Sequence, residues 1–245
     1  MVKKSKVLRN RIGEKYTTNQ NQEIEITDYI DANNVTIKFK NNYIVYNLGY
    51  SKIIRGQVKT PYYKSVYGIG FLGKGVYKGC KYSKLYDIWN KILQRCYSEK
   101  SRYKYKSYKD ITVCEEWHNF QNFAKWYEEN YNPETMQGWH LDKDILSISC
   151  KAYSPKTCCF VPNEINSFFV KREKVECSDK IKFRARIRKN NKEYCLSSFN
   201  TQKEAFQKYK TAKEKHIKEV ADKWKDQIAE KVYQAMYNYK VEITD

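Results

Sequence analysis

The sequence predicts an α+β protein made of three small modules. Runs in which apolar residues alternate with polar ones are typical of half-buried strands, and runs that repeat every third or fourth residue are typical of amphipathic helices. The 245-residue chain contains both kinds, separated by pairs of Asn and clusters of Gly such as those found at turns. We expect the modules at residues 7–62, 63–172 and 178–245.

The first module, residues 7–62, is expected to be a small β module with a basic surface. Three runs in it alternate apolar with polar side chains, and a pair of Asn residues separates each run from the next: Ile24–Tyr29, Val35–Phe39 and Tyr43–Leu48. Such alternation is typical of antiparallel strands joined by tight turns.

The second module, residues 63–172, is expected to carry two amphipathic helices. In Lys84–Tyr97, apolar residues recur at positions i, i+3, i+4, i+7 and i+8. In Glu115–Tyr131, an aromatic stripe is expected to face the core. The polar, basic loop Ser98–Asp110 lies between them, and we assign it only a general attraction for phosphate. A short strand is expected at Ile111–Cys114.

The last part of this module has the order strand, loop, strand, helix. The first strand is expected at Trp139–Ile145 and carries the acidic residues Asp142 and Asp144. A loop with the sequence Tyr-Ser-Pro leads to a second strand at Cys158–Val161, and a helix is expected to start near Pro162.

The third module, residues 178–245, is expected to begin with a hairpin and to continue as a long helix. Phe183–Arg188 and Tyr194–Phe199 alternate apolar with polar residues, and Lys-Asn-Asn-Lys joins them. Thr201 then caps the helix, and Glu204 three residues later completes a capping box.

Charge indicates the class of partner. Lys and Arg number 47 against 28 acidic residues, a formal net charge of +19. An anionic partner offsets the self-repulsion of such a chain, and binding of phosphates with release of counterions favours nucleic acid. Many of the 23 Tyr residues stand beside Lys, a combination that suits phosphate, sugar and base contacts. The alternative is the compositional bias of a Lys-rich, low-GC genome.

One predicted strand concentrates this charge on a single face. Arg184, Arg186 and Arg188 alternate along it, so their side chains project from the same side. We expect this face to contact a DNA groove, as β-ribbon proteins do.

The eight Cys residues contain no Cys-x-x-Cys pair, so no zinc finger or ribbon is expected. A metal cluster of Cys150, Cys158 and Cys159 remains the alternative to plain reduced thiols. No apolar stretch is long enough for a membrane span and no signal peptide is visible, so we expect a cytoplasmic protein.

Aromatic, Arg and Cys anchors recur at fixed spacings over residues 84–166: Trp89-x-x-Ile92-x-x-Arg95-Cys96-Tyr97, Ile111-x-Val113-Cys114-x-x-Trp117-x-x-Phe120-x-x-Phe123, Leu141-Asp142-Lys143-Asp144 and Tyr153-Ser154-Pro155-x-x-Cys158. This pattern resembles the HNH-type endonucleases of phages, of the homing kind. The resemblance implies a central ββα-metal module with flanking helices, in a protein that acts in the cytoplasm of a bacterial host.

Residues 182–220 carry a second pattern: Phe183-Arg-Ala-Arg-Ile187, Phe199 before Thr201-x-x-Glu204-Ala205, and Tyr209-x-x-Ala212. It resembles the ethylene-response-factor or integrase-type DNA-binding domain. The resemblance implies a three-stranded sheet packed on one helix. We expect five basic residues of this region to contact DNA: Lys182, Arg184, Arg186, Arg188 and Lys189.

The HNH resemblance also implies a mechanism with one divalent metal, Mg²⁺ or Mn²⁺, at the scissile phosphate. By position, Asp142 would be a metal ligand on the first strand. Asn166 would be the second ligand, or a phosphate contact, on the helix. Asp144 would support the metal site indirectly, by positioning the residues that bind the metal.

Two positions depart from the family pattern. The general-base His is replaced by Lys143, which either grips a phosphate or belongs to a solvated acid-base patch. The Asn that orients the base is replaced by Thr157. His140, two residues before Asp142 and therefore on the same side of the strand, either replaces the base, binds metal or is merely an exposed residue.

Two functions therefore follow. The first is a phage protein that binds double-stranded DNA and, if active, hydrolyses phosphodiesters with one metal. The second is an inactive protein on the same scaffold, which regulates genes or inhibits a host system through a host protein partner. RNA binding by the Tyr-rich loops is a third, less favoured function. The sequence predicts no oligomeric state.

Overall fold

The computed structural model describes residues 10–79, 83–147, 150–169, 183–189 and 192–242. Helices and several small sheets confirm the α+β class. The chain divides into two compact units, residues 1–82 with 119–121 and residues 83–118 with 122–245. None of the helices in the described ranges combines the length and the apolar character of a membrane span.

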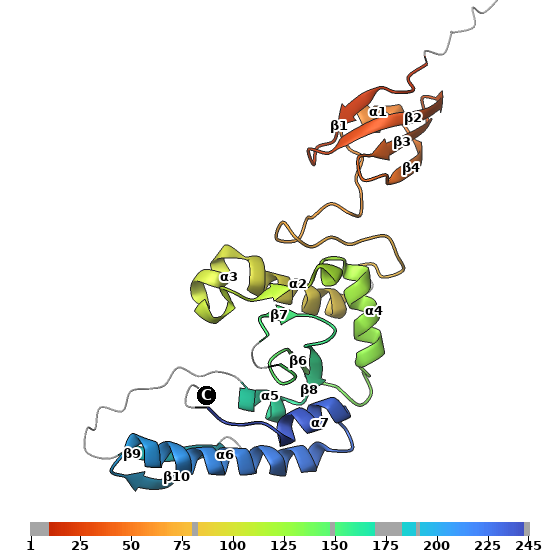
Figure 1. Ribbon diagram of the computed structural model, residues 1–245. Helices are drawn as coiled ribbons and strands as arrows, with labels where there is room; N and C mark the ends of the chain where they lie inside the picture. Colours follow the sequence, from red (N-terminus) through yellow and green to blue (C-terminus); the bar gives the residue numbers. More distant parts are fainter. Residues whose placement is uncertain (1–9, 80–82, 148–149, 170–182, 190–191, 243–245) are drawn as a thin grey trace, which may run out of the picture. The chain divides into compact units, whose positions relative to one another are not determined.

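The first unit contains a four-stranded antiparallel sheet in the order β1-β2-β3-β4 (Figure 1). Its elements are β1 (Lys15–Thr17), β2 (Glu23–Asp31), β3 (Asn34–Phe39), β4 (Ile44–Leu48) and the short helix α1 (Tyr50–Ile54). The predicted Asn turns are present. The Asp31 carboxylate accepts hydrogen bonds from the N–H groups of Asn33 and Asn34, and Asn42 adopts a φ of 66°.

One face of this sheet forms the core of the first unit. Alternate residues of β2 and β3 are buried, together with residues of and after α1: Ile24, Ile26, Val35, Ile37, Phe39, Ile53 and Val58. The three runs predicted as strands are thus confirmed, and the period of two explains their burial.

The second unit begins with α2 (Ser83–Tyr97), α3 (Glu99–Lys104) and the 3₁₀ helix η1 (Lys106–Tyr108). The helix α2 confirms the prediction for this region. The stretch predicted as a basic loop instead contains two short helices, α3 and η1, although neither buries a side chain.

The expected continuous helix over Glu115–Tyr131 is wrong in one respect. It is divided into the 3₁₀ helix η2 (Glu115–His118) and α4 (Phe120–Asn130). The side-chain oxygen of Asn119 accepts the N–H of Gln121 at 3.0 Å, a local bond by which Asn competes with the helical pattern.

The aromatic stripe in these helices is core, as predicted. The ring centroids of Trp117 and Trp126 are 4.6 Å apart, and Phe123 meets Trp117 edge-on at 5.0 Å. The indole N–H of Trp89, on α2, donates to the carbonyl of Trp117 at 2.7 Å. On the other side, Trp126 stacks on Phe160 with centroids 5.5 Å apart.

Two short two-stranded sheets follow. The strands β5 (Thr112–Val113) and β7 (Ala152–Tyr153) are parallel, and β6 (His140–Asp142) and β8 (Cys159–Val161) are antiparallel. The helix α5 (Asn163–Phe169) comes after β8. The strand expected at Trp139–Ile145 is shorter than predicted, because the chain turns after Asp142.

The remaining elements are β9 (Phe183–Lys189), β10 (Lys192–Phe199), α6 (Gln202–Trp224) and α7 (Glu230–Tyr237). The strands β9 and β10 form the predicted hairpin and lie along α6 (Figure 1). The third strand of the expected sheet is not among the described residues, and residues 170–182 lie outside them. Ile217, Val220, Val232 and Met236 belong to the core between α6 and α7.

The hydrogen bonds that cap the N-terminus of α6 can be tested by mutation. Thr201 Oγ1 accepts the N–H of Glu204 at 3.2 Å, and the Glu204 carboxylate accepts the N–H of Thr201 at 3.3 Å, which is the predicted capping box. We expect Thr201→Ala to lower the free energy of unfolding by about 1 kcal/mol, measured as the midpoint of urea unfolding at constant slope.

The matched control is Thr211→Ala on the same helix. This hydroxyl is exposed and donates only to the carbonyl of Gln207 at 3.0 Å. Because such a bond to the preceding turn adds little and Ala favours a helix, the change should stay within about 0.5 kcal/mol. Equal losses in the two variants would contradict the role of the cap.

Candidate functional site

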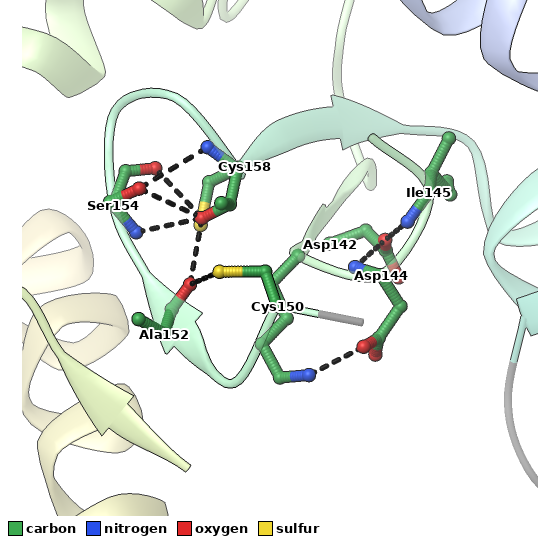
Figure 2. Close-up of polar contacts among 9 residues, drawn as sticks. Asp142, Asp144, Ile145, Cys150, Ala152, Ser154 and Cys158 are labelled. Carbon is green, nitrogen blue, oxygen red and sulfur yellow. Dashed lines mark hydrogen bonds and ion pairs between the residues drawn. The ribbon is translucent and has the colours of Figure 1, made fainter. Parts of the chain in front are cut away.

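The segment formed by β6, β8 and α5 places Asp142 at the end of a strand, paired with Cys159. The side chain is buried, with 8% exposed. One carboxylate oxygen accepts two backbone N–H groups, from Asp144 at 2.7 Å and Ile145 at 2.8 Å (Figure 2). These bonds fold the chain into the turn that ends β6. Burial nevertheless raises the pKa of Asp142 above its ordinary value.

Lys143, which is predicted to replace a general-base His, is also buried, with 7% exposed. Its ammonium group donates to a carboxylate oxygen of Asp144 at 2.5 Å. It lies 5.9 Å from the centre of the Tyr153 ring, which is buried on β7. The charge of Lys143 is thus held inside the segment by one carboxylate and one aromatic face.

Two further cations, Arg95 and Arg102, act on the Cys96 thiol together with Lys143, and their spacing in the sequence does not mark them as site residues. Burial raises the pKa of the Cys96 thiol to about 12, although Lys143, Arg95 and Arg102 all act to lower it. Burial also opposes the charge on Arg95, but Tyr108 and Tyr153 outweigh it and raise the pKa of this guanidinium. Arg95 was visible in the sequence only as one anchor of the motif that begins at Trp89.

Two other predicted site residues, His140 and Asn166, lie on different elements. His140 begins β6 and is exposed, although it precedes the buried Asp142 by two residues. Asn166 lies half-buried on α5, and its backbone N–H bonds to the carbonyl of Pro162 at 3.0 Å. The roles of His140 as a base and of Asn166 as a metal or phosphate ligand stay predictions.

Thr157, which is predicted to replace an orienting Asn, holds its own loop by hydrogen bonds. Its hydroxyl donates to the carbonyl of Ala152 at 2.7 Å and accepts the N–H of Ser154 at 3.1 Å. The N–H of Cys158 bonds to the carbonyl of Ser154 at 3.0 Å. Figure 2 shows these bonds closing the loop between β7 and β8. The Thr157 hydroxyl thus forms its hydrogen bonds within the loop.

The carboxylates predicted as ligands of a divalent cation already form hydrogen bonds within the protein. Asp142 uses one carboxylate oxygen for two backbone bonds, and Asp144 already neutralises an ammonium group. Among the residues that the structure describes, no three His, Cys, Asp or Glu side chains are grouped closely enough to hold a metal ion. The roles of Asp142, Asn166 and Asp144 as metal ligands stay predictions, and we derive no step through a metal.

The described cysteines are free thiols, of which Cys96, Cys158 and Cys159 are buried. The six that the structure describes form no disulfide with one another. Burial raises the pKa of Cys158 to about 12 and that of Cys159 still further. Because a thiol binds metal as its thiolate, these two are poor ligands near neutral pH. The Sγ of Cys150 contacts the carbonyl of Ala152 at 3.8 Å.

The hairpin carries the predicted arginine row. Arg184, Arg186 and Arg188 are exposed on one face of β9, while Ala185 and Ile187 are buried on the other. Arg186 pairs with Glu193 of β10 at 3.3 Å, and both side chains remain largely exposed.

Lys189, also expected to contact DNA, belongs to the other face of β9. Its ammonium group bonds to Glu219 of α6 at 3.1 Å, so it ties the hairpin to the helix. Lys182 lies outside the described residues.

Comparisons of the chain with protein-family models, with curated proteins and with solved structures find no match. The resemblances to HNH-type endonucleases and to the ethylene-response-factor domain stay predictions.

Two substitutions of Asp142 separate the effect of its buried charge on stability from the effect of its hydrogen bonds to the backbone. Asp142→Asn keeps an oxygen for the two N–H groups and removes the buried charge, so we expect a higher melting temperature at pH 7. Because the folded-state pKa is raised, the cost of the charge appears only as pH rises through that pKa. The advantage of Asn should shrink as pH falls toward 4.

Asp142→Ala is the contrasting variant. It leaves the N–H groups of Asp144 and Ile145 without their acceptor, and we expect a loss of about 1–3 kcal/mol. The loss should be largest at low pH, because at higher pH the variant also removes the buried charge. A destabilised Asp142→Asn at pH 7 would contradict the assignment of a costly buried charge.

Proposed function

We propose that this protein binds double-stranded DNA through the arginine row of β9, and that its ββα segment supports binding without hydrolysing the DNA. The observation that carries the proposal is the exposed row Arg184, Arg186 and Arg188 above a buried inner face. The net charge of +19 supports the same class of partner.

The geometry of the hairpin suits a DNA groove. Residues two apart on a strand are separated by roughly 6.6 Å, and their side chains point the same way. A two-stranded ribbon is narrow enough to enter the major groove, where Arg can bond to the edge of guanine with two N–H groups. The ion pair of Arg186 with Glu193 is exposed and therefore weak, so DNA can replace the carboxylate.

The chemistry of Lys143 argues against hydrolysis. A general base must accept a proton from water, and an ammonium group has no free electron pair to do so. Here the ammonium group is bonded to Asp144. Arg95 on α2 and Arg102 on α3 add positive charge near Cys96, which favours contact with phosphate.

Metal-dependent hydrolysis of DNA is the second candidate function. The order β6, β8, α5 favours it, with Asp142 on the strand and Asn166 on the helix. The exposed His140 would then be the base and Mg²⁺ or Mn²⁺ the cofactor. A host protein partner and a role in a phage stay predictions from the sequence.

Binding through the arginine row is tested with Arg186→Ala. If Arg186 contacts a base edge, affinity for a specific duplex should fall by about 1–3 kcal/mol, measured by fluorescence anisotropy at fixed salt. The matched control is Lys125→Ala on α4, because Lys125 is likewise an exposed cation paired with an exposed carboxylate, Glu129 at 4.0 Å. Glu193→Ala should leave binding intact or tighten it.

The two variants change the net charge equally. A loss of affinity that is the same for Arg186→Ala and Lys125→Ala would mean that only total charge matters, and the arginine row would not be the binding site. A wild-type protein with no affinity for duplex DNA at low salt would remove the proposed function.

Hydrolysis is tested by incubating supercoiled DNA with the protein and Mg²⁺, Mn²⁺ or EDTA. We expect no metal-dependent nicking. Asp142→Asn and His140→Ala serve as controls, since the first keeps the turn and the second changes an exposed side chain. Nicking that requires metal and is lost in both variants would establish the second candidate function.

A further inference from the structure

A second exposed surface lies on α3 and η1, between Glu99 and Asp110. Neither helix has a buried residue. Tyr103 is 90% exposed and Tyr105 48% exposed, which is far more than a tyrosine held for packing would be. These rings therefore contribute almost nothing to the core.

The surface is nevertheless fixed by local bonds. The guanidinium of Arg102 donates to the carbonyl of Lys109 at 2.6 Å, and the N–H of Tyr105 bonds to the carbonyl of Ser101 at 2.8 Å. The rings of Tyr105 and Tyr108 meet edge-on with centroids 6.4 Å apart. The tyrosines are thus presented on a folded segment.

Cations alternate with these rings. The segment contains Lys100, Arg102, Lys104, Lys106 and Lys109 against the acidic Glu99 and Asp110. The ammonium group of Lys104 lies 5.2 Å from the centre of the Tyr105 ring, and the Arg95 guanidinium lies 6.0 Å from that of Tyr108. Asp110 is already paired with Lys151 at 3.2 Å.

The composition of this surface selects one class of partner. Between Glu99 and Asp110 the chain has no aliphatic side chain to insert into a membrane, and its five cations against two carboxylates favour an anionic partner. Exposed aromatic faces beside cations are the arrangement that binds single-stranded nucleic acid, since unpaired bases stack on the rings and the cations hold the backbone. Paired bases inside a duplex cannot stack in this way.

We infer that α3 and η1 form a binding site for single-stranded DNA, in which bases stack on Tyr103 and Tyr105 and the neighbouring Lys and Arg side chains bind phosphates. The inference rests on the proposed function only in taking the strand to be DNA. It gives the protein a preference for duplexes that carry an unpaired tail, because the hairpin and this surface bind different parts of such a molecule.

The test measures the affinity of the whole protein for three labelled probes: oligo(dT), a blunt duplex and the same duplex with an oligo(dT) tail. Tyr103→Ala should weaken binding to oligo(dT) about tenfold, as loss of one stacked base does. Tyr103→Phe keeps the ring and should bind normally. Because Tyr103 is so exposed, neither change should affect folding.

The matched control is Tyr46→Ala, which removes a tyrosine that is 65% exposed on β4. Affinity for the blunt duplex should be unchanged in Tyr103→Ala and reduced in Arg186→Ala. Affinity for oligo(dT) should be reduced in Tyr103→Ala and unchanged in Arg186→Ala. Equal effects of Tyr103→Ala and Tyr46→Ala, or an unchanged affinity for oligo(dT), would overturn the inference while leaving duplex binding in place.

The remaining outcomes are also distinguishable. Binding of oligo(dT) that depends on Tyr103, without any affinity for duplex, would support this inference and remove the proposed function. An affinity for oligo(rU) more than tenfold above that for oligo(dT) would overturn the assignment to DNA and point to RNA.

Discussion

The stacking of Trp126 on Phe160 is the contact on which the second unit depends. It joins α4 to β8, and β8 in turn is the partner of the strand that bears Asp142. Trp117 extends the cluster toward α2 by accepting the indole N–H of Trp89 at its carbonyl. Strands of three residues have too few backbone bonds to persist alone, so this aromatic cluster supplies the stability that their hydrogen bonds lack.

Within that frame, the two most buried charged groups have opposite consequences. The Asp142 carboxylate stabilises the turn by accepting two backbone N–H groups, whereas burial of its negative charge is unfavourable. Lys143 brings a positive charge into the same turn, and Asp144 compensates it. The side chains of this segment therefore serve the turn and the local charge balance.

The sequence predicts the elements better than their ends. Alternation identified β2, β3 and β9, and helical spacing identified α2, because burial of one face imposes those periods. The sequence did not predict the end of an element where a single side chain determines it. Asn119 interrupts the helix after His118, and Asp142 ends β6. For the site, the exposure of the arginine row followed from alternation, but the gathering of Arg95, Lys143 and Tyr153 depends on tertiary packing that spacing does not reveal.

The burial of Ala185 and Ile187 has a consequence for how quickly the hairpin can associate with a partner. Since the inner face is packed and Lys189 is tied to Glu219, the backbone lost its conformational freedom when the protein folded. An encounter needs to order only the outer guanidinium groups, so little entropy remains to be lost. The rate of association is then governed by the electrostatic attraction between the two molecules and falls as salt screens it.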